Sequence, residues 1–408
     1  MAGNFIGIAG ITVILGIAWL LSTNRGAIKF RTVGAAFGLQ VVIAAFVLHL
    51  DWGKRMIEGI SAGVQAVIDY SGAGINMVFG GLANAPVGFS FAVQVLPVII
   101  FFSALMSVLY HLKIMQWIVK LVGGGLRAVI GTGRVESLNA AANVFVGQTE
   151  APLVIRPYLK GLTEPQLFAV MVSGVASIAG TVLAGYVLMG ANMQYLLAAS
   201  FMAAPGGLLM AKIIMPDGEA ASPGDERGKL HMEHSRHSNV ILAAAVGAGD
   251  GLKLAVNIGA MLIAFVALIA LFNGIVGGVA GMVGIEDLTL QKMLGWIFSP
   301  LMFLLSVPWE EAQAAGTLFG EKLVLNEFVA FSHLDEYLAG MSPRTVAVVT
   351  FSLCGFANLS SIAILLGGIG SLVPEKKELI AKFGLRAVAA GSLSNLMSAA
   401  LAGLLLTF

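Results

Sequence analysis

Long apolar stretches, separated by short polar or basic connections, follow one another along the whole chain. A run of about 18 or more apolar residues is long enough to cross the hydrocarbon core of a bilayer as a helix. The stretches that meet this length are 5–22, 33–50, 89–112, 166–189, 195–215, 252–282, 345–372 and 388–408. The pattern predicts an all-α polytopic membrane protein with about eight transmembrane helices.

Two further segments are apolar on one side only. Residues 56–78 are interrupted by Glu58 and Asp69, and residues 115–130 carry Lys120 and Arg127. Helices with one apolar and one charged face lie in the plane of the membrane interface. We expect both segments to be interfacial helices.

Polar residues and prolines break the apolar pattern at corresponding places in the two halves. The segments 137–158 and 290–316 are too polar for a helix that faces lipid, and each predicts a re-entrant hairpin. The apolar stretches that follow them are broken at 177–180 and 355–361. Paired broken segments are typical of transporters built from inverted repeats, with the binding site between the repeats.

Composition and motifs exclude several classes of function. The chain of 408 residues is 58% hydrophobic and 11% charged, with a net charge of +1, and this balance favours neither a nucleic-acid partner nor an acidic substrate. Its single cysteine, Cys354, excludes an intrachain disulfide and a thiolate metal cage. No GxxxxGK[ST] loop is present, so ATP does not drive the protein directly.

Three histidines in the polar loop 216–238 have a spacing that could hold a metal. They are His231, His234 and His237. No carboxylate or cysteine completes a convincing metal site there. We interpret this segment as a solvated loop.

Two carboxylates, Glu150 and Glu327, stand in strongly apolar surroundings, one in each half of the chain. A charge at the centre of a bilayer costs roughly 2.5–3.5 kcal/mol on insertion scales, so such residues face a partner, a cavity or a substrate. They predict a polar site near the membrane midplane. An acid/base enzyme is a weaker interpretation, because no nucleophile, histidine partner or metal cluster accompanies the pair.

The neighbours of Glu150 suggest what this site could bind. Gln148 and Thr149 precede it, and at an unwound hairpin tip the three side chains can converge on one ligand. An amide offers a donor and an acceptor together, which suits the edge of a nucleobase. A polar contact between helices is the alternative.

The neighbours of Glu327 suggest a sugar. A carboxylate accepts hydrogen bonds from two hydroxyls, as in a vicinal diol. Asn358 and Ser361 are three positions apart and share a helix face. The alternatives are an ion pair of Glu327 with Lys322 or Arg156, and helix contacts made by the small polar residues.

A small cation could bind beside the first hairpin. Asn143 and Ser177 offer side-chain oxygens, and the carbonyls of Val146 and Ile178 offer main-chain oxygens where helices are unwound.

Five sequence strings together resemble the concentrative nucleoside transporter family. They are GQTEAPLVIRPYL (147–159), SGVASIAGTVLAGY (173–186), AASFMAAPGGLL (198–209), VLNEFVAF (324–331) and SLCGFANLSSIAILLGGIGSL (352–372). The likeness covers nearly the whole chain and implies a bacterial member in the inner membrane. It also implies that the protein is not an enzyme.

The resemblance implies roles for individual residues. The nucleobase would contact Gln148, Thr149 and Glu150 and the apolar Val182 and Leu254, while the ribose would contact Glu327, Asn358 and Ser361, with Phe356 as an aromatic neighbour. A sodium ion would be held by Asn143, Ser177 and the carbonyls of Val146 and Ile178. Proton-coupled relatives carry Ser in place of Thr149, so sodium is the expected cation and proton coupling is the alternative.

The resemblance further implies a homotrimer in the lipid bilayer. It also implies import of nucleosides, with uridine-like nucleosides as the expected substrates, by an elevator-type movement. A channel is a less favoured alternative, because the polar sites are asymmetric rather than arranged in rings.

The chain is predicted to divide into six segments. They are mainly scaffold spans and interfacial helices (1–135), the first hairpin and broken helix of a transport domain (136–215), a polar loop (216–238), a long scaffold span (239–286), the second hairpin and broken helices of the transport domain (287–372), and a basic loop with the C-terminal span (373–408).

Overall fold

The computed structural model describes residues 2–83, 90–218, 238–282, 284–285 and 288–406. Every regular element in these ranges is a helix, so the predicted all-α class is confirmed. The three histidines of the polar loop lie outside the described residues.

The α-helices follow the apolar pattern of the sequence closely. They are α1 (Ala2–Leu20), α2 (Phe30–Leu48), α3 (Asp51–Phe79), α4 (Phe91–Gln94), α5 (Leu96–His111), α6 (Ile114–Ile130), α7 (Arg134–Asn143), α8 (Ala151–Val154), α9 (Glu164–Ala176), α10 (Gly180–Leu188), α11 (Met193–Ile214), α12 (Val240–Met282), α13 (Leu290–Leu304), α14 (Trp309–Val324), α15 (Glu327–Ser332), α16 (Leu334–Leu338), α17 (Pro343–Leu353), α18 (Ser361–Leu372) and α19 (Lys377–Leu405).

Among the described residues, six helices are long and apolar enough to cross a membrane. The pair α13 and α14 adds a seventh crossing if it counts as one span, but it is bent by 118° at its break. The first and seventh predicted spans are shorter here, because the apolar part of α1 is Ile6–Leu20 and the seventh is split into α17 and α18. The chain is therefore a multi-span helical membrane protein.

Four helices, α9, α10, α11 and α19, form the buried centre of the molecule. The membrane-length windows of α9–α10 and α11 are each 94% buried, and that of α19 is 83% buried. Polar side chains join these helices to their neighbours inside the core. The Gln40 amide of α2 donates to the Ser398 hydroxyl of α19 (2.9 Å), and Lys212 of α11 pairs with Glu136 of α7 (2.5 Å). The central helices thus hold the first hairpin in place.

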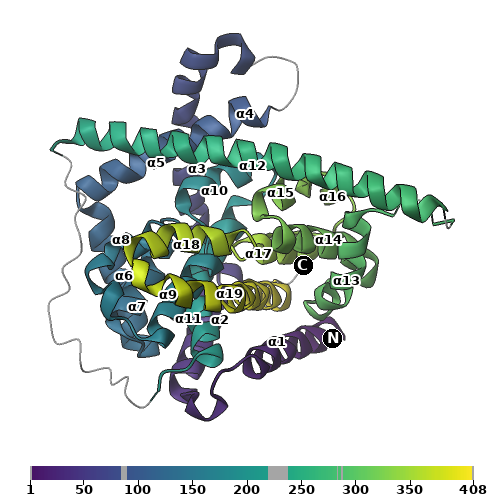
Figure 1. Cartoon of the computed structure of the whole chain (residues 1–408), viewed down its shortest axis with the longest axis horizontal. Helices are drawn as coiled ribbons and strands as arrows, with labels where there is room; N and C mark the ends of the chain where they lie inside the picture. Colours follow the sequence, from purple (N-terminus) through teal and green to yellow (C-terminus); the bar gives the residue numbers. More distant parts are fainter. Residues whose placement is uncertain (1, 84–89, 219–237, 283, 286–287, 407–408) are drawn as a thin grey trace.

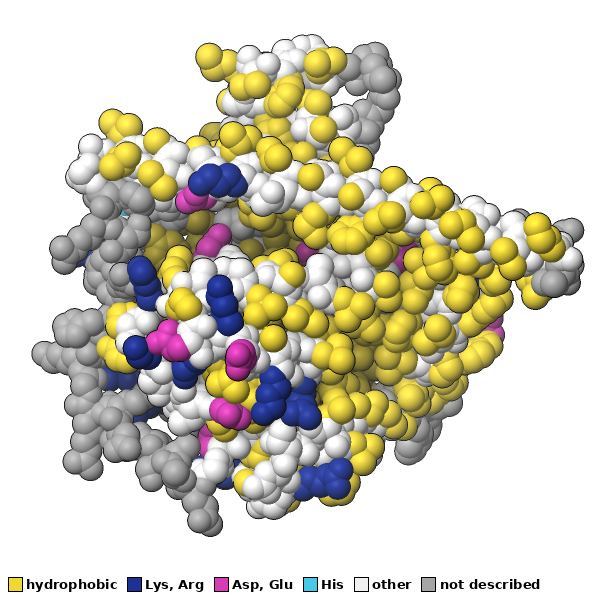
Figure 2. Space-filling view, viewed as in Figure 1, with side chains coloured by type: hydrophobic (Ala, Val, Ile, Leu, Met, Phe, Trp, Pro, Cys, Tyr) yellow, Lys and Arg dark blue, Asp and Glu magenta, His cyan; other side chains and the backbone are white. Residues whose placement is uncertain are grey.

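The 43-residue helix α12 lies at the edge of the molecule, and only 17% of its apolar window is buried. Figure 1 shows it running along one side, in front of α5 and α10. In Figure 2 hydrophobic side chains cover most of its visible length, and the surface is hollowed between α12 and the helices below it. An exposed apolar helix of this length suits contact with lipid or another subunit.

Both predicted hairpins are present as helix–turn–helix segments. The first runs from α7 through a turn to α8 and a 3₁₀ segment, Arg156–Gly161, and the second is the bent pair α13 and α14. The two segments expected at the interface are also helices, α3 and α6.

One predicted boundary was wrong, and one apolar stretch is part of a longer helix. The stretch 252–282 belongs to α12, which begins at Val240, within the predicted scaffold segment 239–286. The basic loop expected before the last span is helical from Lys377. Its Lys382 and Arg386 lie one turn apart on the exposed face of α19. Phe383 and Ala387, which directly follow them in the sequence, are buried. Sequence hydropathy hides such an amphipathic start of a helix.

Candidate functional site

Two interrupted helices meet at the centre of the molecule. Helix α9 ends at Ala176 and α10 begins at Gly180, while α17 ends at Leu353 and α18 begins at Ser361, so both predicted breaks are confirmed. The Phe356 amide of the second break donates to the Ser177 carbonyl of the first (3.1 Å). Backbone polar groups freed by one break therefore satisfy those of the other.

Asn395 of α19 ties the two breaks together. Its amide nitrogen donates to the carbonyls of Ala176 (2.7 Å) and Cys354 (2.8 Å), at the ends of α9 and α17. Its oxygen accepts a hydrogen bond from the buried Lys322 ammonium of α14 (2.9 Å). One side chain thus caps two helix ends that would otherwise leave buried carbonyls unpaired.

We expect Asn395→Leu to destabilise the protein by roughly 3–5 kcal/mol, because it leaves a buried ammonium and two buried carbonyls without their partner. Thermal unfolding in detergent measures this effect. Asn192→Leu, which removes the cap of α11 (Asn192 accepts from the Gln194 amide at 2.9 Å), should cost only about 1 kcal/mol. Equal losses in the two variants would contradict a special role for Asn395.

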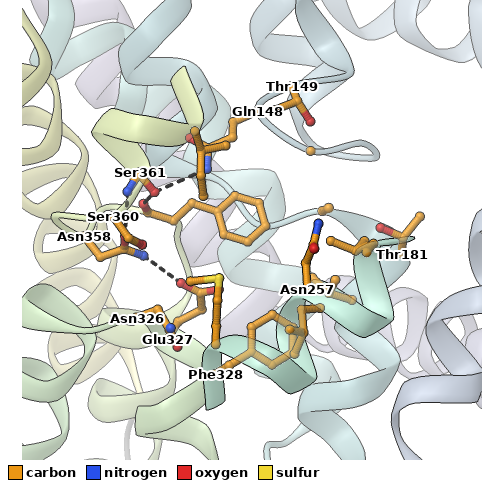
Figure 3. Close-up of a pocket in the computed structure, with 18 of the residues that line it drawn as sticks. Gln148, Thr149, Thr181, Asn257, Asn326, Glu327, Phe328, Asn358, Ser360 and Ser361 are labelled. Atoms are coloured by element: carbon orange, nitrogen blue, oxygen red, sulfur yellow. Dashed lines mark hydrogen bonds between the residues drawn. The ribbon is translucent and has the colours of Figure 1, made fainter. Parts of the chain in front are cut away.

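A cavity of about 480 Å³ lies beside the two breaks (Figure 3). Its volume is within the range of small-molecule sites. Its wall is formed by the turn of the first hairpin, the starts of α10 and α15, the second break, α18 and one face of α12. The residues that line it are Gly147, Gln148, Thr149, Glu150, Ala179, Thr181, Val182, Leu254, Asn257, Ile258, Ala260, Met261, Leu262, Asn326, Glu327, Phe328, Phe356, Asn358, Ser360, Ser361 and Ile364.

All nine side chains that the sequence suggested for a substrate therefore line this single cavity. Glu150 and Glu327, from opposite halves of the chain, face the same space. Neither lysine nor arginine is among its lining residues, so the charged groups at this cavity are the two carboxylates.

The turn of the first hairpin holds Glu150 and Gln148. The Gly147 amide donates to the Glu150 carboxylate (3.2 Å), and the Glu150 amide donates back to the Gly147 carbonyl (3.1 Å). The Gln148 amide nitrogen donates to the Ser361 hydroxyl (3.2 Å), while its buried oxygen has no partner among the described residues. The hairpin tip thus contacts the second break and still leaves the Gln148 oxygen open.

Close packing fixes the position of Gln148. Gly174 of α9 faces it, and a Cβ atom at this glycine would lie 2.9 Å from the Gln148 Cβ. Only a glycine leaves room for the hairpin turn at this approach.

Glu327 begins α15, directly after Asn326, whose side chain accepts from the Val329 amide (3.0 Å) and caps the helix. One Glu327 oxygen accepts from the Tyr186 hydroxyl (3.1 Å) and the other from the Asn358 amide nitrogen (3.0 Å). Figure 3 shows the contact between Glu327 and Asn358. The carboxylate is thus oriented by neutral donors, while the Lys322 ammonium is directed to Asn395.

Asn358 also organises the start of α18. Its side-chain oxygen accepts from the Ser360 hydroxyl (2.7 Å) and from the Ser361 amide (2.9 Å). The Ser361 hydroxyl donates to the Phe356 carbonyl inside the break. These contacts present a carboxylate, an amide and two hydroxyls on one side of the cavity, a set suited to a polyhydroxylated ligand.

The four positions suggested for a cation lie where the first hairpin meets the first break. The Gly180 amide donates to the Phe145 carbonyl (3.0 Å), which brings the end of α7 to this break. The Asn143 nitrogen donates to the Asn139 carbonyl (3.0 Å), and its buried oxygen has no partner among the described residues. In the described part of the chain, no backbone amide donates a hydrogen bond to the carbonyl of Val146 or of Ile178. Oxygens of this kind fit a hard cation.

Sequence reasoning missed several residues of the site. The cavity in Figure 3 is also lined by Thr181, Asn257, Asn326, Phe328 and Ser360. Outside the cavity wall, Tyr186 orients the Glu327 carboxylate and Asn395 holds the two helix breaks together. Asn257 and Asn395 carried a signal, since each is an amide within a long apolar stretch. Tyr186 carried none, because tyrosine is common in apolar segments.

A second cavity of about 360 Å³ adjoins the first. Glu150 and Thr181 line both, and the second also includes Tyr110 of α5 and Asp250 of α12. The hairpin turn therefore separates two spaces along the same face of α12.

Comparison with known proteins agrees with the fold. Residues 195–403 match the family model "Na+ dependent nucleoside transporter C-terminus", and residues 9–82 match the corresponding N-terminal model. Residues 92–193 match a model described as "Gate: Nucleoside recognition".

Relatives cover nearly the whole chain. The chain is 50% identical over 398 residues to the uncharacterized transporter YutK of Bacillus subtilis, covering 98% of each chain. It is 49% identical over 412 residues to the nucleoside permease NupC of Helicobacter pylori, covering 98% of this chain and 97% of that one. The structure of CNTnw in an inward-facing substrate-bound state matches with a TM-score of 0.93 and 50% identity, covering 99% of this chain and 98% of the other. The chain therefore belongs to the concentrative nucleoside transporter family, whose members are multi-pass transporters of the inner membrane in bacteria rather than enzymes.

Proposed function

We propose that the protein is a sodium-driven symporter that imports nucleosides, with uridine-like nucleosides as substrates. The observation that carries the proposal is the cavity in which Glu150 and Glu327 face one space that no lysine or arginine lines. A nucleoside is uncharged and rich in hydroxyl donors, and it satisfies two carboxylates as an anionic nucleotide would not.

Two groups of lining side chains bind the two parts of the substrate. Gln148, Thr149 and Glu150 bind the nucleobase, against Val182 and Leu254, because the open Gln148 oxygen and the Glu150 carboxylate accept from its edge. Glu327, Asn358 and Ser361 bind the ribose hydroxyls. Phe356 offers an aromatic surface between them.

Sodium is the coupling ion. Asn143, Ser177 and the carbonyls of Val146 and Ile178 supply its oxygens, and the unpartnered Asn143 oxygen supports this assignment. The descriptions of the two matching family models as sodium-dependent also support it. The ion supplies positive charge that stabilises the hairpin turn next to the break. Since both ligands favour the same arrangement of the hairpin, each raises the affinity for the other by the same factor.

Transport proceeds by movement of one part of the chain against another. The hairpins and broken helices, 136–215 and 287–372, form the mobile part, and α12 with the spans of 1–135 forms the scaffold. The exposed apolar face of α12 supports a homotrimer in lipid. Light scattering of the detergent-solubilised protein, corrected for detergent, should give three times the mass of one chain, 42.3 kDa.

Uptake of radiolabelled uridine into proteoliposomes tests the function. An inward sodium gradient should accumulate uridine above the external concentration. Choline in place of sodium should abolish accumulation. Accumulation driven by an inward proton gradient without sodium would instead favour proton coupling, and equilibration without accumulation would favour a channel.

Gln148→Ala should change the preference among nucleobases. It removes the open Gln148 acceptor at the hairpin turn, so KM should rise about 5- to 30-fold, by different factors for uridine and cytidine. Competition of unlabelled nucleosides against uridine uptake measures the factors. The control is Gln65→Ala, whose side chain bonds Asp69 on the exposed face of α3. Equal losses for all bases would contradict the role of Gln148.

A further inference from the structure

One polar side chain on the α12 wall of the cavity has no role in the account so far. This helix contributes Leu254, Asn257, Ile258, Ala260, Met261 and Leu262 to the cavity. Residues three and four positions apart share one face of a helix, so Asn257 lies beside Leu254 and Met261. It is the polar member of a wall that is otherwise apolar.

The Asn257 side chain makes no hydrogen bond with any described residue. In Figure 3 its amide points into the cavity, on the side opposite Asn358 and Ser361. Polar side chains within membrane spans mark binding sites when no partner in the protein satisfies them. An exposed amide in this position is open to a hydrogen-bonding ligand.

The other amide in the apolar part of α12 shows the contrast. Asn273, about four turns further along, donates to the Gln291 side chain (2.9 Å) and accepts from the Leu290 amide (2.7 Å). Both of its polar atoms serve the junction between α12 and α13. Asn273 is therefore a structural amide, whereas the polar atoms of Asn257 are open to the cavity.

We propose that Asn257 is a specificity-determining residue that binds the edge of the nucleobase from the α12 side. This inference rests on the proposed function of the cavity. Glu327, Asn358 and Ser361 already supply the groups that suit the ribose on the facing wall. The apolar surface around Asn257 suits a flat ring, and its amide offers both the donor and the acceptor that the edge of a pyrimidine requires.

The assignment places recognition on two separate parts of the fold. Helix α12 packs tightly on α5, because a Cβ at Gly251 would lie 2.8 Å from the Ile100 Cα and one at Gly247 would lie 2.5 Å from the Ser107 Cβ. The other polar groups of the cavity belong to the hairpins and broken helices. Asn257 thus completes the site from the α12–α5 pair.

Equilibrium binding of uridine, cytidine and 2′-deoxyuridine to the purified protein in sodium tests the inference. Asn257→Leu keeps the size of the side chain and should weaken uridine binding about 10-fold. The ratio of the uridine and cytidine affinities should change, and the ratio for uridine and 2′-deoxyuridine should stay the same. Asn257→Gln, which retains the amide, should recover part of the affinity.

Asn273→Leu is the matched control. It should lower the unfolding temperature and leave the three affinities within twofold, whereas Asn257→Leu should not lower the unfolding temperature. Affinities of Asn257→Leu within twofold of the wild-type values would overturn the inference while leaving the proposed function intact. A change confined to the ratio for 2′-deoxyuridine would also overturn it. If the wild-type protein bound no nucleoside, the proposed function itself would fail, and the inference with it.

Discussion

Glu327→Gln should weaken nucleoside binding by about 100-fold or more and remove most uptake. Hydrogen bonds to a charged acceptor contribute roughly 1.5–3 kcal/mol each, and the ribose offers two hydroxyls to this carboxylate. The substitution also turns one acceptor into a donor. The Tyr186 hydroxyl and the Asn358 nitrogen now donate to the two carboxylate oxygens, so the variant would place two donors against each other.

Titration calorimetry with uridine and uptake in proteoliposomes measure this loss. Glu310→Gln is the control, because Glu310 is an exposed carboxylate at the start of α14 that does not line the cavity. It should bind and transport as the wild-type protein does. Uptake that survives intact in Glu327→Gln would show that the ribose is bound elsewhere.

Asn143→Val should raise the half-saturating sodium concentration about 10-fold or more. It removes the buried, unpartnered Asn143 oxygen and supplies no other oxygen in its place, and a cation cannot replace a lost ligand oxygen in a site closed to water. By linkage, uridine affinity at a fixed, subsaturating sodium concentration should fall as well. Uridine binding measured over a series of sodium concentrations, at constant ionic strength, separates the two effects.

Asn143→Asp is the matched variant, because it keeps an oxygen at the same position. It should retain sodium-dependent binding where Asn143→Val loses it. Equal sodium dependence in both variants and in the wild-type protein would place the cation site away from Asn143.

The fold was largely predictable because membrane helices leave a strong signal. Apolar runs marked the spans, and glycines and polar residues marked the breaks after Ala176 and Leu353. The boundary error at Lys377 has a physical cause. There a helix begins with residues that are charged on one face only, and average hydropathy places such residues in a loop.

The site was predictable where polar residues interrupt apolar sequence, as at Gln148 and Asn358. The groups that orient it were not, because their role depends on contacts between distant segments. Tyr186 meets Glu327 from 141 positions away, and Asn395 reaches Ala176 across 219 positions. The role proposed for Asn257 was not predictable from sequence either. Its direction toward the cavity, seen in the structure, distinguishes it from a structural amide such as Asn273.

Crystals of the protein grown with sodium and 5-iodouridine test the central claim most directly, because anomalous scattering locates the iodine without reference to any assumed pose. The account predicts one strong iodine peak per chain, inside the cavity between Glu150 and Glu327 and next to the side chains that are proposed to bind the base. An iodine peak only in the neighbouring cavity beside Tyr110 and Asp250, or only on the lipid-facing surface, would contradict it.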